Sequence, residues 1–237
     1  MLKLLLQIPV AVDSLGVDLS QTNEPIEKTL SIIDLITSGG LGGQIIMITL
    51  GVLSILTVYL FTERFQVIKK AMKEDPHFMN KVKDYLSENK VESIVALSER
   101  SSSPIANMVA KGALCKSGSS KEIQEAMERQ GNLEIYKLEH NLSSLATIAG
   151  AAPMIGFLGT VIGMIIAFHE MASAGGQIDV EMLSKGIYTA MTTTVAGLIV
   201  GIVAYLAYNH LVEKVTKATF KMEQGTAEFI DVIAQNK

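Results

Sequence analysis

The sequence predicts an all-α membrane protein with three transmembrane helices, two of which extend into a cytoplasmic helical bundle. Three stretches predict the spans, because residues 35–62, 141–168 and 186–212 contain no Asp, Glu, Lys or Arg. Each stretch is longer than the about 20 apolar residues that a helix needs to cross the hydrocarbon core of a bilayer. The charged segment between the first two stretches shows neither the alternating apolar pattern nor the hairpin turns of β-strands.

The chain divides into five predicted parts along its length. Ile26, Leu30 and Ile33 recur at helical spacing, which favours an amphipathic helix on the outer membrane surface, with a frayed tail as the alternative. The first residues resemble a weak signal peptide without a clear cleavage site, and we expect this segment to be retained. The parts are an extracytoplasmic N-terminal segment with that helix (1–40), the first transmembrane helix (41–62), a cytoplasmic helical domain (63–140), the second and third transmembrane helices with a short outer loop (141–212), and a cytoplasmic C-terminal helix (213–237).

The orientation of the spans follows from the Lys and Arg residues at their ends. Most of these residues lie in segments 63–140 and 213–237, whereas the opposite flanks offer only Lys28 and Lys185. Because cytoplasmic loops carry the excess of Lys and Arg, the N-terminus should lie outside and the C-terminus in the cytoplasm. The net charge of −4 provides no basic excess to neutralise phosphates, so we expect no nucleic-acid partner.

The cytoplasmic parts of the second and third spans are predicted to be long helices. Ser119 and Glu122 fit a capping box, which predicts a helix start at residue 120. No stop signal follows until the second span ends, so we expect one unbroken helix to about Glu170. The third span should likewise continue toward Ile233. Apolar stripes along both helices require that they pack against each other, against shorter helices or against further copies of the chain.

The second and third spans contain stripes of small residues that predict close helix packing. Small residues let helix backbones approach each other within a membrane. A proline inside a helix lacks the N–H of one backbone hydrogen bond, so the second span should kink or loosen at that point. The residues in question are Pro153, Gly156, Gly159 and Gly163 in the second span and Gly197 and Gly201 in the third.

Threonines are the candidate functional side chains of the spans. The candidates are Thr160 in the second span and Thr189, Thr192, Thr193 and Thr194 in the third. Two interpretations stay open: these hydroxyls serve packing alone, since a membrane threonine can bond to its own i−4 carbonyl, or they line a polar ion pathway. No carboxylate lies within any span, and a proton carrier at membrane depth normally needs one or a histidine. Any such acid must therefore come from a partner.

Enzymatic activity and cofactor binding are not expected from this sequence. Ser143 and Ser144 have no intramembrane His or Asp partner that would make either a nucleophile. The single cysteine, Cys115, excludes an intramolecular disulfide and a Cys-rich metal site. We therefore expect no catalytic residue, no metal and no cofactor.

Two motifs resemble the core of the MotA/TolQ/ExbB proton-channel family. They are LATIAGAAPMIGFLGTVIGM at residues 145–164 and GIYTAMTTTVAGL at residues 186–198. The chain matches the family pattern in order, over about a quarter of its length. The matched parts are the small residues, the Pro, Gly-x-x-Gly-Thr-Val-x-Gly, Gly-Ile-x-x-Ala and Thr-x-x-Gly-Leu. Length and topology are most similar to ExbB, with TolQ close. The best-known members carry a glutamate in the Gly-Ile-x-Glu-Ala motif, where this chain has Thr189.

The resemblance implies a stator subunit of a motor in the bacterial inner membrane, driven by the proton motive force. It implies a pentamer that encloses an ExbD-like single-span protein with a membrane aspartate, and that powers a TonB-like protein. The second and third spans would line the pore with Thr160 and Thr194, and the first would face lipid. The N-terminus would be periplasmic and the coupling ion a proton, with sodium left open. The alternatives are a TolQ-like subunit for envelope maintenance and a packing-only scaffold.

Overall fold

The computed structural model describes residues 40–73, 75–173 and 180–235, and every regular element in them is an α-helix. The predicted N-terminal amphipathic helix lies outside these residues, as do residues 174–179 of the predicted outer loop. The all-α class is therefore confirmed for the described part of the chain. The helices are α2 (Gly40–Ala71), α3 (Phe78–Ser87), α4 (Val91–Glu99), α5 (Pro104–Leu114), α6 (Ser120–Glu139), α7 (Leu142–Ser173) and α8 (Val180–Gln235).

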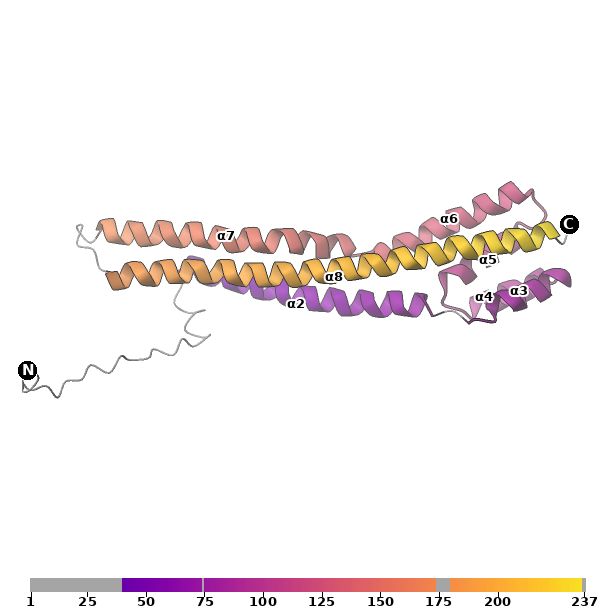
Figure 1. Ribbon diagram of the computed structural model, residues 1–237, viewed down its shortest axis with the longest axis horizontal. Helices are drawn as coiled ribbons and strands as arrows, with labels where there is room; N and C mark the ends of the chain where they lie inside the picture. The colour runs from indigo at the N-terminus through magenta and orange to yellow at the C-terminus, as the bar shows by residue number, and fades with distance from the viewer. Residues whose placement is uncertain (1–39, 74, 174–179, 236–237) are drawn as a thin grey trace, which may run out of the picture.

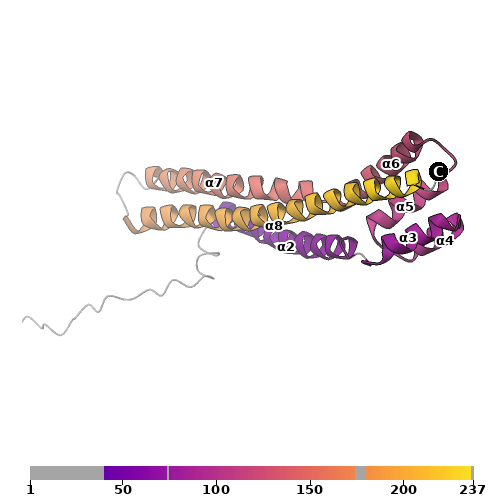
Figure 2. The same cartoon turned by 45° about the vertical axis from the view of Figure 1, so that its right-hand side comes forward.

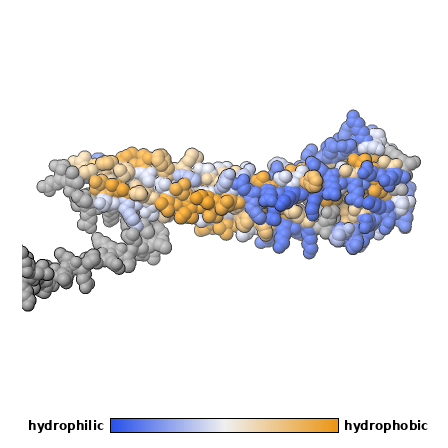
Figure 3. Space-filling model, viewed as in Figure 1, coloured by the Kyte–Doolittle hydropathy of each residue, from blue (hydrophilic) through white to orange (hydrophobic). Residues whose placement is uncertain are grey.

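The helices form an elongated bundle around α8, which runs along its whole length (Figures 1 and 2). Helices α2 and α7 lie beside one half of α8, and α3–α6 lie beside the other half. Three segments are long and apolar enough to cross a membrane, namely Gly42–Ala71, Ser120–Ser173 and Gly186–Gln235, which confirms the three predicted spans by length and composition. Hydrophobic residues gather over the half that holds α2 and α7, and hydrophilic ones over the other half (Figure 3).

Each half of the bundle has its own hydrophobic core. In the apolar half, Leu50 of α2, Leu145 of α7 and Leu211 of α8 are buried together. In the charged half, Val109 of α5 and Phe229 of α8 belong to a second buried cluster, which also includes residues of α3, α4 and α6. Because α8 contributes to both clusters, it holds the two halves in one continuous structure.

The expected unbroken helix from residue 120 to about Glu170 is wrong, because the chain breaks between α6 and α7. Helix α6 ends at Glu139, α7 begins at Leu142, and Asn141 has a φ of 64°. Asparagine is one of the few residues that adopt this left-handed conformation readily, and it is common just beyond the end of a helix. The apolar stripe continues across the break, so hydrophobic spacing gave no sign of it.

Two other predictions about the long helices are confirmed. The Ser119 hydroxyl accepts from the Glu122 N–H at 3.2 Å, and the Glu122 carboxylate accepts from the Ser119 N–H at 2.8 Å, which completes the capping box. Helix α8 continues without interruption from the third span to Gln235. The location of these extensions in the cytoplasm stays a prediction.

Polar contacts join α2 and α5 to the end of α6. Arg64 of α2 is buried, and its guanidinium donates to the Lys137 carbonyl at 3.4 Å. The last carbonyls of a helix have no intrahelical donor, so a cation at this position satisfies one of them. Glu134 is also buried, and it accepts from Asn107 of α5 at 3.2 Å and from Lys137 at 2.8 Å. These contacts support the chain just before the α6–α7 break.

We predict different effects on stability for two substitutions at the break. Asn141→Val should lower the free energy of unfolding by about 1–2 kcal/mol, because a β-branched residue is disfavoured at positive φ. Asn141→Gly should preserve stability, because glycine adopts this conformation without steric cost. Unfolding of the two purified variants in detergent, followed by circular dichroism, measures the difference. Equal stability of both variants would show that the left-handed conformation is not required.

Candidate functional site

The candidate site is the contact between α7 and α8, where the two backbones approach through glycines. A methyl group on Gly156 would lie 2.7 Å from the Thr193 carbonyl oxygen, and one on Gly197 would lie 2.6 Å from the Ala152 carbonyl oxygen. Real Cβ atoms essentially never come that close to another heavy atom. The two helices can therefore keep this separation only while both positions lack a side chain.

The same contact extends along both helices. A methyl group on Gly201 would lie 2.5 Å from Cγ of Pro153, so the proline ring occupies the space that Gly201 leaves free. Gly163 packs against Ala190 in the same way, because a Cβ added to Gly163 would lie 2.9 Å from the Cβ of Ala190. Pro153 stands inside α7 without ending the helix. Its missing N–H leaves the Ala149 carbonyl without the usual i+4 donor.

Two threonines join α8 to α7 by hydrogen bonds. The Thr194 hydroxyl donates to the Gly156 carbonyl at 3.0 Å. Thr193 is 1% exposed. Its hydroxyl oxygen lies 3.2 Å from the Gly156 carbonyl oxygen and 2.7 Å from the Ala190 carbonyl oxygen of its own helix. One hydroxyl has one proton, so Thr193 can donate to only one of them at a time. Gly159 leaves the room for the Thr193 side chain, because an added Cβ there would overlap it.

The remaining threonines do not bridge the two helices. Thr160 donates to the Phe157 carbonyl at 2.6 Å and Thr192 to the Tyr188 carbonyl at 2.9 Å, each within its own helix, and both are half-buried. Thr189 is 8% exposed, and its hydroxyl has no hydrogen-bond partner among the described residues. Its methyl group lies near α2, 3.6 Å from the position of a Cβ on Gly43. The five predicted hydroxyls therefore occupy three different environments.

Ala190, rather than Thr189, continues the α8 contact face toward the N-terminus of that helix. Thr189 stands in four-residue steps with Thr193, Gly197 and Gly201, and this spacing by itself predicts that it shares their face. A helix has 3.6 residues per turn, so four-residue steps rotate by about 40° each, and the face drifts over several turns. Sequence reasoning missed two alanines at this contact, Ala190 and Ala167. A Cβ added to Gly186 would lie 2.6 Å from the Cβ of Ala167. Small side chains at alternating three- and four-residue spacing were the available signal.

The site is electrically neutral. Between residues 141 and 168 and between 186 and 212 the chain has no Asp, Glu, Lys or Arg. Within the described residues, no group of three His, Cys, Asp or Glu side chains lies close enough to hold a metal ion. Residues 141–168 and 186–212 can therefore donate and accept hydrogen bonds through hydroxyls and carbonyls, but they offer no carboxylate to carry a proton across.

Large apolar side chains cover the outer faces of both helices. Phe157 and Ile165 of α7 and Ile199 and Leu206 of α8 are each more than half exposed in the single chain. Exposed apolar faces of this size mark contact with lipid or with other protein chains. One copy of the chain therefore leaves much of the apolar surface around the site uncovered.

We predict that glycine substitutions at the helix contact destabilise the protein selectively. Gly156→Ala and Gly197→Ala should each lower the free energy of unfolding by about 1–3 kcal/mol, because the added methyl group pushes the backbones apart. Gly150→Ala is the matched control in α7, since nothing lies within 4 Å of its added Cβ. Reversible unfolding in SDS measures all three. The close contact is refuted if the three variants unfold alike.

A different outcome is expected at Thr189. Thr189→Val should raise the free energy of unfolding by about 1 kcal/mol, because it removes a buried hydroxyl that has no partner and retains the shape of the side chain. Thr193→Val is the matched control, since it removes a hydroxyl that is bonded, and it should destabilise. The same unfolding experiment tests both, and a loss of stability in Thr189→Val would show that its hydroxyl has a partner in the membrane.

Comparison with known proteins gives one consistent family. The sequence pattern of the MotA/TolQ/ExbB proton channel family matches residues 100–224. The chain is 31% identical to the Tol-Pal system protein TolQ of Haemophilus influenzae, over 85% of this chain and 91% of that protein. It is 39% identical to the biopolymer transport protein ExbB of Helicobacter pylori, over 35% of this chain and 54% of that protein.

A putative ExbB homolog of Methanothermobacter thermautotrophicus is 34% identical over 43% of this chain and 36% of that protein. The matched region includes α7, the α7–α8 contact and most of α8. The two motifs indicated the family, and length and topology indicated ExbB with TolQ close; these relatives confirm both. More than half of the chain carries the family pattern, so this protein belongs to the MotA/TolQ/ExbB proton channel family.

Proposed function

We propose that the protein is an ExbB-like stator subunit of an inner-membrane motor driven by the proton motive force. With an ExbD-like partner it energises TonB-dependent transport across the outer membrane. The family and the names of the relatives support a proton-channel stator of the ExbB or TolQ kind in a multi-pass inner-membrane setting. The observation that carries the finer proposal is the chemistry of the membrane-spanning parts of α7 and α8. Residues 141–168 and 186–212 present hydroxyls and carbonyls and contain no acid.

The missing acid supports a partner with a membrane aspartate. Such a carboxylate is costly to hold charged at membrane depth, so its protonation and release change the energy of the partner strongly. In the proposed cycle a proton from the periplasm neutralises the partner's aspartate, and release to the cytoplasm charges it again. One charge that crosses 100 mV yields about 2.3 kcal/mol, which is enough to bias a step of the partner beyond thermal noise.

The threonines of α7 and α8 differ in how well they suit such a pathway. Thr160 and Thr192 bond only within their own helices and are half-buried in the single chain, so their oxygens remain open to a second acceptor or donor. Thr194 is also half-buried, beside the Gly156 carbonyl. Thr193 is enclosed between the helices and serves the contact itself. The coupling ion is a proton, with sodium as the alternative, because hydroxyls and carbonyls also suit hard cations.

Several copies of the chain are required by this proposal. The exposed apolar faces of α7 and α8 point to cover by further copies and by the partner, and those of α2 to cover by lipid. We propose a pentamer around the partner's helices, with the N-terminus periplasmic and the C-terminus cytoplasmic. The work then passes through the partner to a TonB-like protein.

A TolQ-like role in envelope maintenance is the second candidate. It is favoured by the extent of the match, because the Haemophilus influenzae TolQ aligns over nearly its whole length. Expression of this chain with its own small partner in one strain that lacks ExbB and in another that lacks TolQ distinguishes the two roles. Restored TonB-dependent uptake supports the first, and restored detergent resistance alone supports the second.

We predict that removal of the pathway hydroxyls reduces energy coupling without loss of assembly. Thr160→Val and Thr194→Val preserve the side-chain shape, and each should lower TonB-dependent uptake about tenfold, because a hydrogen bond to an ionised group contributes about 1.5 kcal/mol or more. Thr147→Val is the matched control, since Thr147 is exposed on α7 and bonds only to Ser143 of its own helix. Uptake is compared at equal amounts of assembled complex.

Two results would argue against the pathway. Full uptake by the Thr160 and Thr194 variants would leave the hydroxyls with a packing role only, as the scaffold alternative holds. Loss of the assembled complex in the same variants would support that alternative as well. An equal loss of uptake in Thr147→Val would mean that any valine in α7 impairs the protein.

A further inference from the structure

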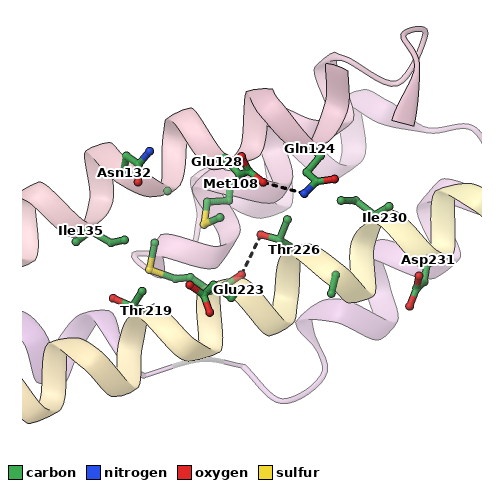
Figure 4. Close-up of a pocket in the computed structure, with 13 residues that line it drawn as sticks. Met108, Gln124, Glu128, Asn132, Ile135, Thr219, Glu223, Thr226, Ile230 and Asp231 are labelled. Carbon is green, nitrogen blue, oxygen red and sulfur yellow. Dashed lines mark hydrogen bonds between the residues drawn. The ribbon is translucent and has the colours of Figure 1, made fainter. Parts of the chain in front are cut away.

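An open groove lies between α6 and α8 in the charged half of the bundle, where the two helices diverge (Figures 1 and 4). It has a volume of about 620 Å³. Its floor is apolar, with Met108 from α5, Gly131 and Ile135 from α6, and Met222 from α8. Phe220, which follows the lining residue Thr219 in α8, is 67% exposed. A groove with an apolar floor and an exposed aromatic neighbour is suited to contact with another protein surface.

Three carboxylates line this groove, and we call it the acidic groove. Glu128 projects from α6, and Glu223 and Asp231 project from α8 (Figure 4). None of the described Lys or Arg residues lines it. Among the described residues, none of the three acids takes part in an ion pair, although Glu128 accepts from the amide of Gln124 at 2.8 Å. A cationic surface would therefore find unneutralised partners here.

A basic surface lies elsewhere on the same chain, where α2 ends and α4 ends. Lys70, Lys73 and Arg100 line a hollow of about 540 Å³ together with Phe78 and Leu97, and we call this surface the basic corner. All three cationic side chains are exposed, and none forms an ion pair within the described part of the chain.

Asp75 is the one described acid that lines the basic corner, and it is already paired. Its carboxylate accepts from the His77 N–H at 3.0 Å and from Lys81 at 3.1 Å. The backbone N–H of His77 and then the Lys81 ammonium lower the pKa of Asp75. Glu74, which follows Lys73 in the chain, lies outside the described residues. The described side chains thus leave the corner with a positive balance.

The acidic groove and the basic corner lie at neighbouring levels along the bundle. Ala71 and Met72, between the two lysines of the corner, share a small cavity with Ala218 and Met222 of α8. Met222 also belongs to the floor of the acidic groove. Copies inserted in one membrane with the same orientation are related by rotation about the membrane normal, and this rotation preserves the level of each surface. The corner of one copy can therefore face the groove of the next.

We propose that the acidic groove of one copy receives the basic corner of the neighbouring copy in the assembled ring. This proposal rests on the homo-oligomer of the proposed function. The contact joins two different surfaces of the chain, so it can repeat from copy to copy around a ring. Once the ring closes, every groove and every corner has a partner. Charge complementarity between the two surfaces sets the register of the contact. A cationic segment of the small partner is the competing occupant.

Cross-linking between two differently tagged chains tests this contact in the full complex. In a Cys115→Ser background, one chain carries Glu223→Cys and the other carries Lys73→Cys. A short bis-maleimide is used, because the Cβ atoms of a Lys–Glu pair lie farther apart than the about 3.5–4.5 Å of a disulfide. Glu228→Cys is the matched control, since Glu228 lies on the opposite face of α8 and pairs with Lys83 of α3 at 2.7 Å.

We expect a product that carries both tags for Glu223→Cys and none for Glu228→Cys. Absence of that product while the complex remains oligomeric overturns the proposal and leaves the proposed function standing. A cross-link from Glu223→Cys to the small partner instead also overturns it. If the unsubstituted chain never forms an oligomer, the proposed function fails as well, so the two failures are distinguishable.

A charge exchange gives a second test that does not depend on cysteines. Lys70→Glu with Lys73→Glu should abolish the oligomer measured by light scattering in detergent, and so should Glu128→Lys with Glu223→Lys. All four substitutions together should restore it, because the charges again complement each other. Loss of the oligomer in each pair without restoration in the fourfold variant would overturn the proposal.

Discussion

The contact of two glycine-lined helix faces is the constraint on which the rest of this structure depends. In a membrane, apolar side chains gain little by leaving lipid for protein, so helices associate through close packing and hydrogen bonds. Gly156 and Gly197 meet backbone to backbone, and the Gly156 carbonyl accepts from the Thr194 hydroxyl of the facing helix. A side chain at either glycine would separate the helices and break this bond.

This contact also bears on the partner that the proposed function requires. Within residues 141–168 and 186–212, the faces that α7 and α8 turn toward each other are neutral, and the faces that they turn outward are apolar. Hydroxyls and carbonyls can guide an ion but cannot hold a proton at membrane depth as a carboxylate can. The subunit is thus suited to surround an acid that another protein provides, which agrees with its membership of a proton-channel family.

Helix α8 connects this site to the charged half of the molecule. Leu211 belongs to the core beside α2 and α7, and Phe229 to the core beside α3–α6, on one uninterrupted helix. The second connection between the two halves, through α6 and α7, is interrupted at Asn141. Arg64 binds the end of α6 close to this break. A displacement of the membrane-spanning part of α8 would therefore be transmitted along the same helix to the acidic groove. A displacement of α7 would reach α6 only through the break at Asn141.

Residue order alone specifies the three spans, the capping box at Ser119, the long continuation of α8 and the glycine positions, because charge, capping chemistry and spacing are properties of a single helix. Packing between helices was needed to locate the break at Asn141, since the apolar stripe runs on across it. It also decided that Ala190 faces Gly163 while Thr189 lies toward α2. Periodicity reports which residues share a face, but only packing shows which neighbour that face meets and which hydroxyl finds a carbonyl.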